Sequence, residues 1–180
     1  MDWWVYLLAL IGVVAVAVAA AFLGRFLYMR QVRRSLVRLL GRREAVVAAA
    51  NGLDLVIEHL SMGDDEALAV FASDPGSDDR RALEDVASRM RILADDLRVM
   101  PLPKRLWPVA EGMERAARLL AEQAGRVGEA TTPDSALDAL AEIRVQEVRE
   151  QVLAVNADLQ PLLDAFRVHD PAVYGGGLYI

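Results

Sequence analysis

The segment WWVYLLALIGVVAVAVAAAFLGRFLYMRQVRRSLVRLLGRR, residues 3–43, determines how the rest of the chain is organised. Its first part, residues 3–24, contains no charged residue and no proline. At 1.5 Å per residue this part makes about 33 Å of helix, enough to cross a hydrocarbon core of about 30 Å. A buried helix of a soluble domain rarely lacks charge over such a length. We therefore predict a transmembrane helix over residues 3–24.

Aromatic side chains lie at both ends of this span, as is typical of the membrane–water interface. Trp3 and Trp4 begin the apolar run, and Tyr28 follows it, so we expect these three to contact the interface or a partner. A cleaved signal peptide would need a positively charged start and a shorter apolar run. The chain instead begins Met1-Asp2, which favours an uncleaved anchor.

The charges that flank the span predict its orientation. Arginines near a span stay on the cytoplasmic side of the membrane. The outer flank, residues 1–2, has only Asp2, whereas residues 25–43 hold seven arginines and no acid: Arg25, Arg30, Arg33, Arg34, Arg38, Arg42 and Arg43. We predict an inner (plasma) membrane protein with residues 1–2 outside and residues 25–180 in the cytoplasm. The seven arginines are expected to contact anionic lipid headgroups.

Composition limits the domain organisation, the chemistry and the partners that the remainder of the chain can have. Of 180 residues, about 150 follow the anchor, which suits one domain with its own core. The chain has no Cys, so disulfides and thiolate chemistry are excluded. The net charge is −6, and the part after residue 43 holds 13 basic and 25 acidic side chains. That balance argues against a nucleic acid partner, whose phosphates need a basic surface.

Apolar residues recur at steps of three and four in four segments, which predicts an all-α fold. The first segment continues the anchor through the basic juxtamembrane helix, 25–43, to about residue 62. The others cover residues 80–100, 109–126 and 133–169. The last segment has a coiled-coil-like seam from Val145 onward and a predicted local kink at Pro161. We expect an antiparallel cytoplasmic bundle of about four helices over residues 44–169.

The connectors carry recognisable turn signals. Residues 63–79 are acidic and predict a solvated loop, in which Ala67 to Ala72 form one or two helical turns. Pro101 and Pro103 end one helix, and the basic, aromatic turn that they start is expected to come part of the way back toward the membrane. Thr132-Pro133 is typical of a helix start.

The C-terminal tail, residues 170–180, combines three glycines with apolar and aromatic residues. Helix lengths predict that it returns to the membrane surface, where the interface or a partner would contact Tyr174, Leu178, Tyr179 and Ile180. A tail without fixed structure and capture of its terminal carboxylate by a partner are the alternatives.

No pattern of catalytic, metal-ligating or nucleotide-binding residues is present. His59 and His169 belong to no ligand motif, and phosphate-binding glycine loops are missing. We therefore expect no cofactor, no metal and no enzymatic activity. The layout of anchor, long helix and bundle resembles the LemA family, but Gly52-Leu53-Asp54-Leu55-Val56 stands where that family has an Arg-x-Asp-Leu-x-Pro-x-Leu type segment. The chain is not assigned to that family.

Two functions fit these features. The first is a structural or scaffolding protein whose bundle docks an unidentified protein partner. The second is a ligand-sensing bundle coupled to the anchor. An inward-facing Arg, Asn or Gln beside a cavity would favour the sensor, and a solid core with an exposed apolar patch would favour the scaffold. Homo-oligomerisation also stays open, because small residues in the span let helices approach closely: Ala17, Ala20, Ala21 and Gly24.

Overall fold

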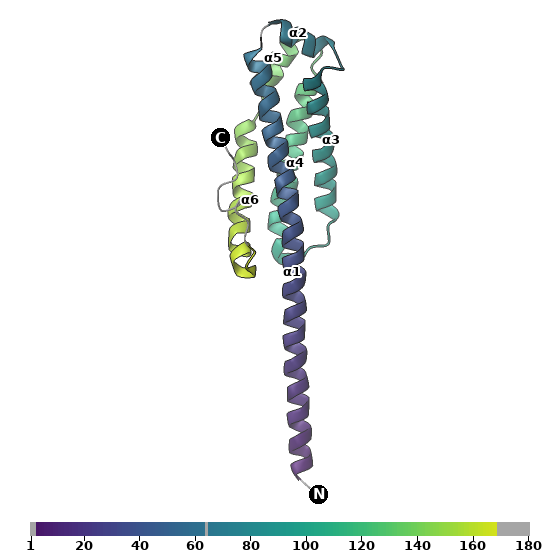
Figure 1. Ribbon diagram of the computed structural model, residues 1–180, viewed down its shortest axis with the longest axis vertical. Helices are drawn as coiled ribbons and strands as arrows, with labels where there is room; N and C mark the ends of the chain where they lie inside the picture. The colour runs from purple at the N-terminus through teal and green to yellow at the C-terminus, as the bar shows by residue number, and fades with distance from the viewer. Residues whose placement is uncertain (1–2, 64, 169–180) are drawn as a thin grey trace.

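The computed structural model describes residues 3–63 and 65–168 of the chain. Helix α1, Trp3–Met62, runs through 60 residues without a break (Figure 1). No proline interrupts it, and its glycines each cost only about 1 kcal/mol of helix stability. Its most apolar window has a mean hydropathy of 2.3 and no buried residue. The structure thus confirms one continuous helix that is long and apolar enough to cross a membrane.

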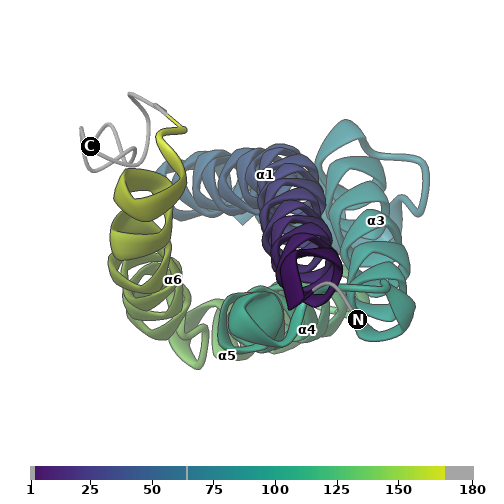
Figure 2. The same cartoon turned by 90° about the horizontal axis from the view of Figure 1, so that it is seen from below.

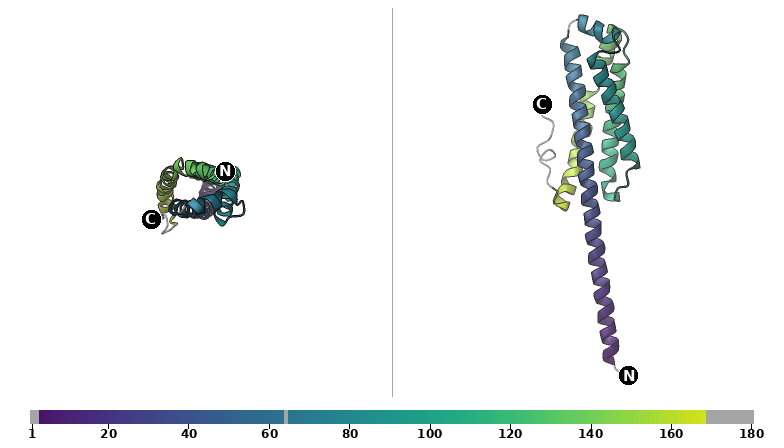
Figure 3. Two further views of the ribbon diagram at one scale, coloured as in Figure 1. Left: turned by 90° about the horizontal axis from the view of Figure 1, so that it is seen from above. Right: turned by 45° about the vertical axis from the view of Figure 1, so that its right-hand side comes forward.

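The second half of α1 forms a bundle with the other helices (Figures 1 and 3). Three long helices lie beside it, and two short ones lie at the end far from the N-terminus. The elements after α1 are α2 (Asp65–Ser73), α3 (Asp78–Val99), the 3-10 helix η1 (Lys104–Leu106), α4 (Trp107–Gly128), α5 (Pro133–Ala141) and α6 (Val145–Phe166). The described part contains no strand, so the all-helical prediction is confirmed.

Helix α4 packs against the three other long helices of the bundle, α1, α3 and α6 (Figure 2). Its apolar residues at steps of three and four are all buried: Val109, Met113, Ala116, Leu120, Ala124 and Val127. Further small side chains, Ala110, Ala117 and Ala121, are buried beside it. Short side chains on α4 let these three helices approach it closely, which yields dense packing.

The predicted single helix over residues 133–169 is wrong, because two helices occupy it. Helix α5 begins as expected, with Thr132 and Ser135 forming a reciprocal capping box. The helix ends at Ala141, and the chain turns before α6. The buried Gln123 of α4 accepts a hydrogen bond from the Arg144 N–H at 3.1 Å, which satisfies a backbone donor that the break exposes.

Helix α6 ends at Phe166, three residues before the predicted end. Arg167 takes a left-handed conformation, with φ 52°. The Val168 N–H then donates to the Leu163 carbonyl at 2.9 Å, and the Arg167 N–H donates to the Asp164 carbonyl at 3.2 Å. This pair of bonds is a Schellman motif, which closes the last turn of a helix. Pro161 lies inside α6, and the helix continues past it.

We predict opposite effects for two glycine substitutions in this fold. A Cβ added at Gly112 of α4 would lie 2.9 Å from Val155 Cγ2 of α6. Overpacking costs about 1–3 kcal/mol, of which better helix propensity recovers about 1. Gly112→Ala should therefore lower the free energy of unfolding, measured by urea titration of the detergent-solubilised chain with circular dichroism.

Gly41→Ala is the matched control, because nothing lies within 4 Å of its added Cβ. This substitution should raise the free energy of unfolding by about 0.5–1 kcal/mol. Equal gains for both variants would contradict the close approach of α4 and α6.

Candidate interaction surfaces

The end of the bundle nearest the apolar segment of α1 is the first candidate surface, which we call the base of the bundle. Among the residues of α1 whose burial the structure describes, Val32 is the first that is buried, and residues 25–31 are exposed. From Gly24 to Val32 the helix rises about 12 Å. A headgroup layer adds about 5–8 Å on each side of the hydrocarbon core. If the apolar span crosses a bilayer, the base lies directly above the headgroups.

The turn between α3 and α4 also lies at this end of the bundle (Figure 1). It presents exposed Lys104 and Arg105, and the Trp107 side chain is half exposed. The indole Nε1 of Trp107 donates to the Leu102 carbonyl at 3.1 Å, which holds the ring in one orientation. Cationic and amphipathic aromatic side chains are the types enriched at membrane interfaces. The sequence indicated the direction of this turn, but not that it extends the basic surface.

The arginines of residues 25–43 divide into two groups. Five are exposed: Arg25, Arg30, Arg33, Arg34 and Arg38. The other two interact with the bundle. Arg42 forms a 3.0 Å ion pair with Asp96 of α3. Arg43 is only 2% exposed, and its Nε donates to Asn156 Oδ1 of α6 at 2.7 Å. The structure therefore places Arg43 inside the protein, away from the surface where a headgroup contact was predicted. Trp3, Trp4 and Tyr28 are exposed, as an interface contact requires.

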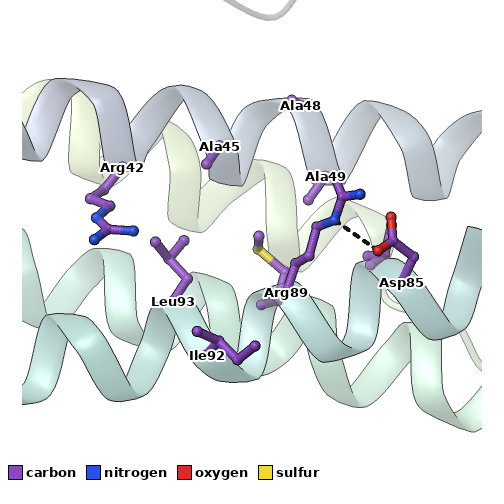
Figure 4. A pocket seen from close by; sticks show the side chains of 10 residues that line it. Arg42, Ala45, Ala48, Ala49, Asp85, Arg89, Ile92 and Leu93 are labelled. Atoms are coloured by element: carbon purple, nitrogen blue, oxygen red, sulfur yellow. Dashed lines mark hydrogen bonds and ion pairs between the residues drawn. The ribbon is translucent and has the colours of Figure 1, made fainter.

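The second candidate surface is a groove between α1 and α3, with a volume of about 410 Å³ (Figure 4). Small residues of α1 line one wall: Ala45, Ala48 and Ala49. Ile92 and Leu93 of α3 line the other wall, and the Ile92 side chain is 61% exposed. We call this surface the α1–α3 groove.

Charged pairs border the groove at both ends. Arg42 and Asp96 pair at one end, and Arg89 Nε lies 2.8 Å from Asp85 Oδ1 toward the other. Both signs of charge are thus present around an apolar floor. This pattern of an apolar centre and a polar rim is typical of protein–protein interfaces.

Buried polar residues inside the bundle were not predicted by the sequence patterns. They are Ser35, Arg43, Arg80, Gln123 and Asn156. Arg80 donates to the Ala130 carbonyl and lies 5.3 Å from the centroid of the Phe71 ring. The cavity beside Arg43 has a volume of about 10 Å³. One water needs at least about 10–15 Å³, so this cavity has no room for a ligand.

His59 contacts Asp79 through Nδ1 and Oδ2 at 2.9 Å, on the surface of the bundle. Among the residues that the structure describes, no group of three or more His, Asp or Glu side chains is arranged to hold a metal ion. His169 lies outside the described residues, as do Tyr174, Leu178, Tyr179 and Ile180 of the predicted tail contact. No family model matches the chain, and no curated protein or solved structure is significantly similar to it.

We predict that the contact between Arg43 and Asn156 contributes to stability. Asn156→Ala removes one acceptor from a buried, charged donor, which costs about 1–3 kcal/mol. The free energy of unfolding should fall by that amount in urea titrations. Gln160→Ala, an exposed change on the same helix, should alter it by no more than about 0.5 kcal/mol.

The double variant Arg43→Met with Asn156→Leu should lose less stability than the two single changes added together. It replaces both polar partners by apolar groups, so that no buried charge is left without its acceptor. Strict additivity would show that the two side chains do not interact.

Proposed function

We propose that this chain is a single-pass membrane scaffold whose cytoplasmic, antiparallel helical bundle docks a helix of a partner protein in the α1–α3 groove. The α1–α3 groove is the observation that carries this proposal. The groove has a volume of about 410 Å³ and exposes the Ile92 side chain, whereas the cavity beside Arg43 measures about 10 Å³. A closed interior and an open apolar groove favour contact with a macromolecule over binding of a small ligand.

A helix is the partner that suits this groove best. Amphipathic helices bind in apolar grooves through residues spaced three and four apart. The alanines of α1 let a third helix approach closely, since short side chains keep the backbone accessible. Ion pairs at both ends of the groove offer charged partners to the polar flanks of such a helix.

A ligand-sensing bundle remains the second candidate, supported by the inward-facing Arg43, Gln123 and Asn156. Such residues would contact a polar ligand if the helices separated. The small volume beside Arg43 weighs against this candidate. We assign the chain no catalytic step, no cofactor and no nucleic acid partner.

The proposed orientation, with the N-terminus outside the inner membrane, predicts a labelling pattern. The chain has no Cys, so single cysteines report their own position. Asp2→Cys should react with a membrane-impermeant maleimide on cells whose outer wall has been removed and whose inner membrane is intact. Ser88→Cys, on the exposed face of α3, should react only after the membrane is permeabilised. The reverse pattern would contradict the proposed orientation.

The docking proposal predicts that crosslinking to the partner depends on Ile92, an exposed residue of α3. A photoreactive amino acid at Ala48 should form a discrete crosslinked product in intact membranes. Ile92→Asp should reduce this product by about tenfold or more, because burial of an isoleucine contributes about 1.5–3 kcal/mol.

Val99→Asp is the control, since Val99 lies on the same helix, is 77% exposed and does not line the groove. It should leave the product unchanged. Equal effects of both variants, or none, would contradict docking in the groove. A product of twice the mass of the chain would identify a second copy as the partner.

A further inference from the structure

A pocket of about 330 Å³ lies at the base of the bundle, between α1 and the end of α6. Its lining combines two charged and three apolar side chains: Phe26, Met29, Arg30, Arg33 and Phe166. Four of these residues lie on one face of α1, at steps of three, one and three. Phe166, the last residue of α6, closes the pocket from the other side and is 7% exposed. Neither helix alone forms this pocket.

The position of the pocket along α1 suits contact with a lipid headgroup layer from its aqueous side. Arg30 lies about 9 Å beyond Gly24 along the helix axis, and Arg33 about 13.5 Å beyond it. The Cα–Cβ bond of a helical residue tilts toward the helix N-terminus, which in α1 is the end with the apolar span. Both arginine side chains therefore start out in the direction of the span.

The chemistry of the lining suits one end of an anionic phospholipid. Arginine binds phosphate with several parallel N–H donors. Two of them three residues apart lie on the same side of a helix. The exposed Phe26 lies nearer the span than either arginine, where the first carbons of an acyl chain would lie. Pockets of about 300 Å³ and above bind small molecules, so this one suits a headgroup rather than a whole lipid.

We propose that this pocket binds the headgroup of one anionic phospholipid, with Arg30 and Arg33 on the phosphate and Phe26, Met29 and Phe166 against the adjoining carbons. This inference rests on the proposed membrane anchoring of the chain. It differs from general attraction to a basic collar, because it assigns one lipid to one site on one face of α1. The bound lipid would join α6 to the base of the anchor.

The test uses the full chain in a neutral detergent, with phosphatidylglycerol or phosphatidylcholine added, and native mass spectrometry to count bound lipids. The intact chain should retain one phosphatidylglycerol, with an affinity about tenfold or more above that for phosphatidylcholine. Arg30→Gln with Arg33→Gln should abolish this preference. Phe26→Ala, a change at an exposed position, should weaken binding of both lipids.

Arg34→Gln with Arg38→Gln is the matched control, because both residues are exposed and neither lines the pocket. This variant removes the same charge and should keep the preference. If both double variants lost the preference for phosphatidylglycerol equally, the site would be overturned, because diffuse attraction between the arginines and the anionic lipid would explain the preference. Competition by inorganic phosphate at equal concentration would also overturn it, since the site would then bind a free anion. Stronger lipid binding after deletion of residues 169–180 would show that the chain's own tail occupies the pocket.

Extraction of membranes with alkaline carbonate separates this inference from the proposed function. If the chain stays in the membrane but shows no lipid preference, only the lipid site fails. If carbonate releases the chain, the membrane anchoring fails, and the inference fails with it.

Discussion

The uninterrupted hydrogen bonding of α1 is the constraint on which the rest of the structure depends. One helix of 60 residues is exposed and apolar at its start and becomes a core element of the bundle from Val32 onward. Proline anywhere in its interior would remove a backbone donor and bend the axis. Because no proline occurs there, the bundle is built directly on the apolar segment and has no flexible linker between the two.

The register of α1 against α6 is specified by polar contacts as well as by apolar area. Arg43 and Asp54 of α1 contact Asn156 and Arg149 of α6, at 2.7 Å and 2.8 Å respectively. Two such contacts along one helix pair form only in one register, since a slide by one turn moves each partner by about 5.4 Å. Apolar stripes alone would tolerate such a slide more easily. The buried arginine thus contributes specificity, whatever its net effect on stability.

Periodicity in the sequence predicted the features that depend on one helix at a time. The stripes of α3 and α4 are buried nearly residue for residue, and the start of α5 follows from Thr132-Pro133. The break before α6 was missed, because no proline or glycine marks it. Its stabilising contact comes from Gln123, 21 residues earlier in the chain. The position of Arg43 was missed for the same reason, since its partner Asn156 is 113 residues away. Contacts of this kind leave no trace in local spacing.

The continuity of α1 fixes the direction in which the α1–α3 groove faces relative to the apolar span. Arg42, at one end of the groove, follows Gly24 by about five full turns at 3.6 residues per turn, so that both residues point the same way on an ideal helix. Gly24 belongs to the small-residue side of the apolar span, together with Ala17 and Ala20. The groove and that side of the span are therefore in phase. A straight helix seated in the groove and continued toward the N-terminus of α1 meets the small residues without changing direction. One residue inserted between Gly24 and Val32 would rotate the two surfaces about 100° apart, so that they would no longer lie on one face of α1.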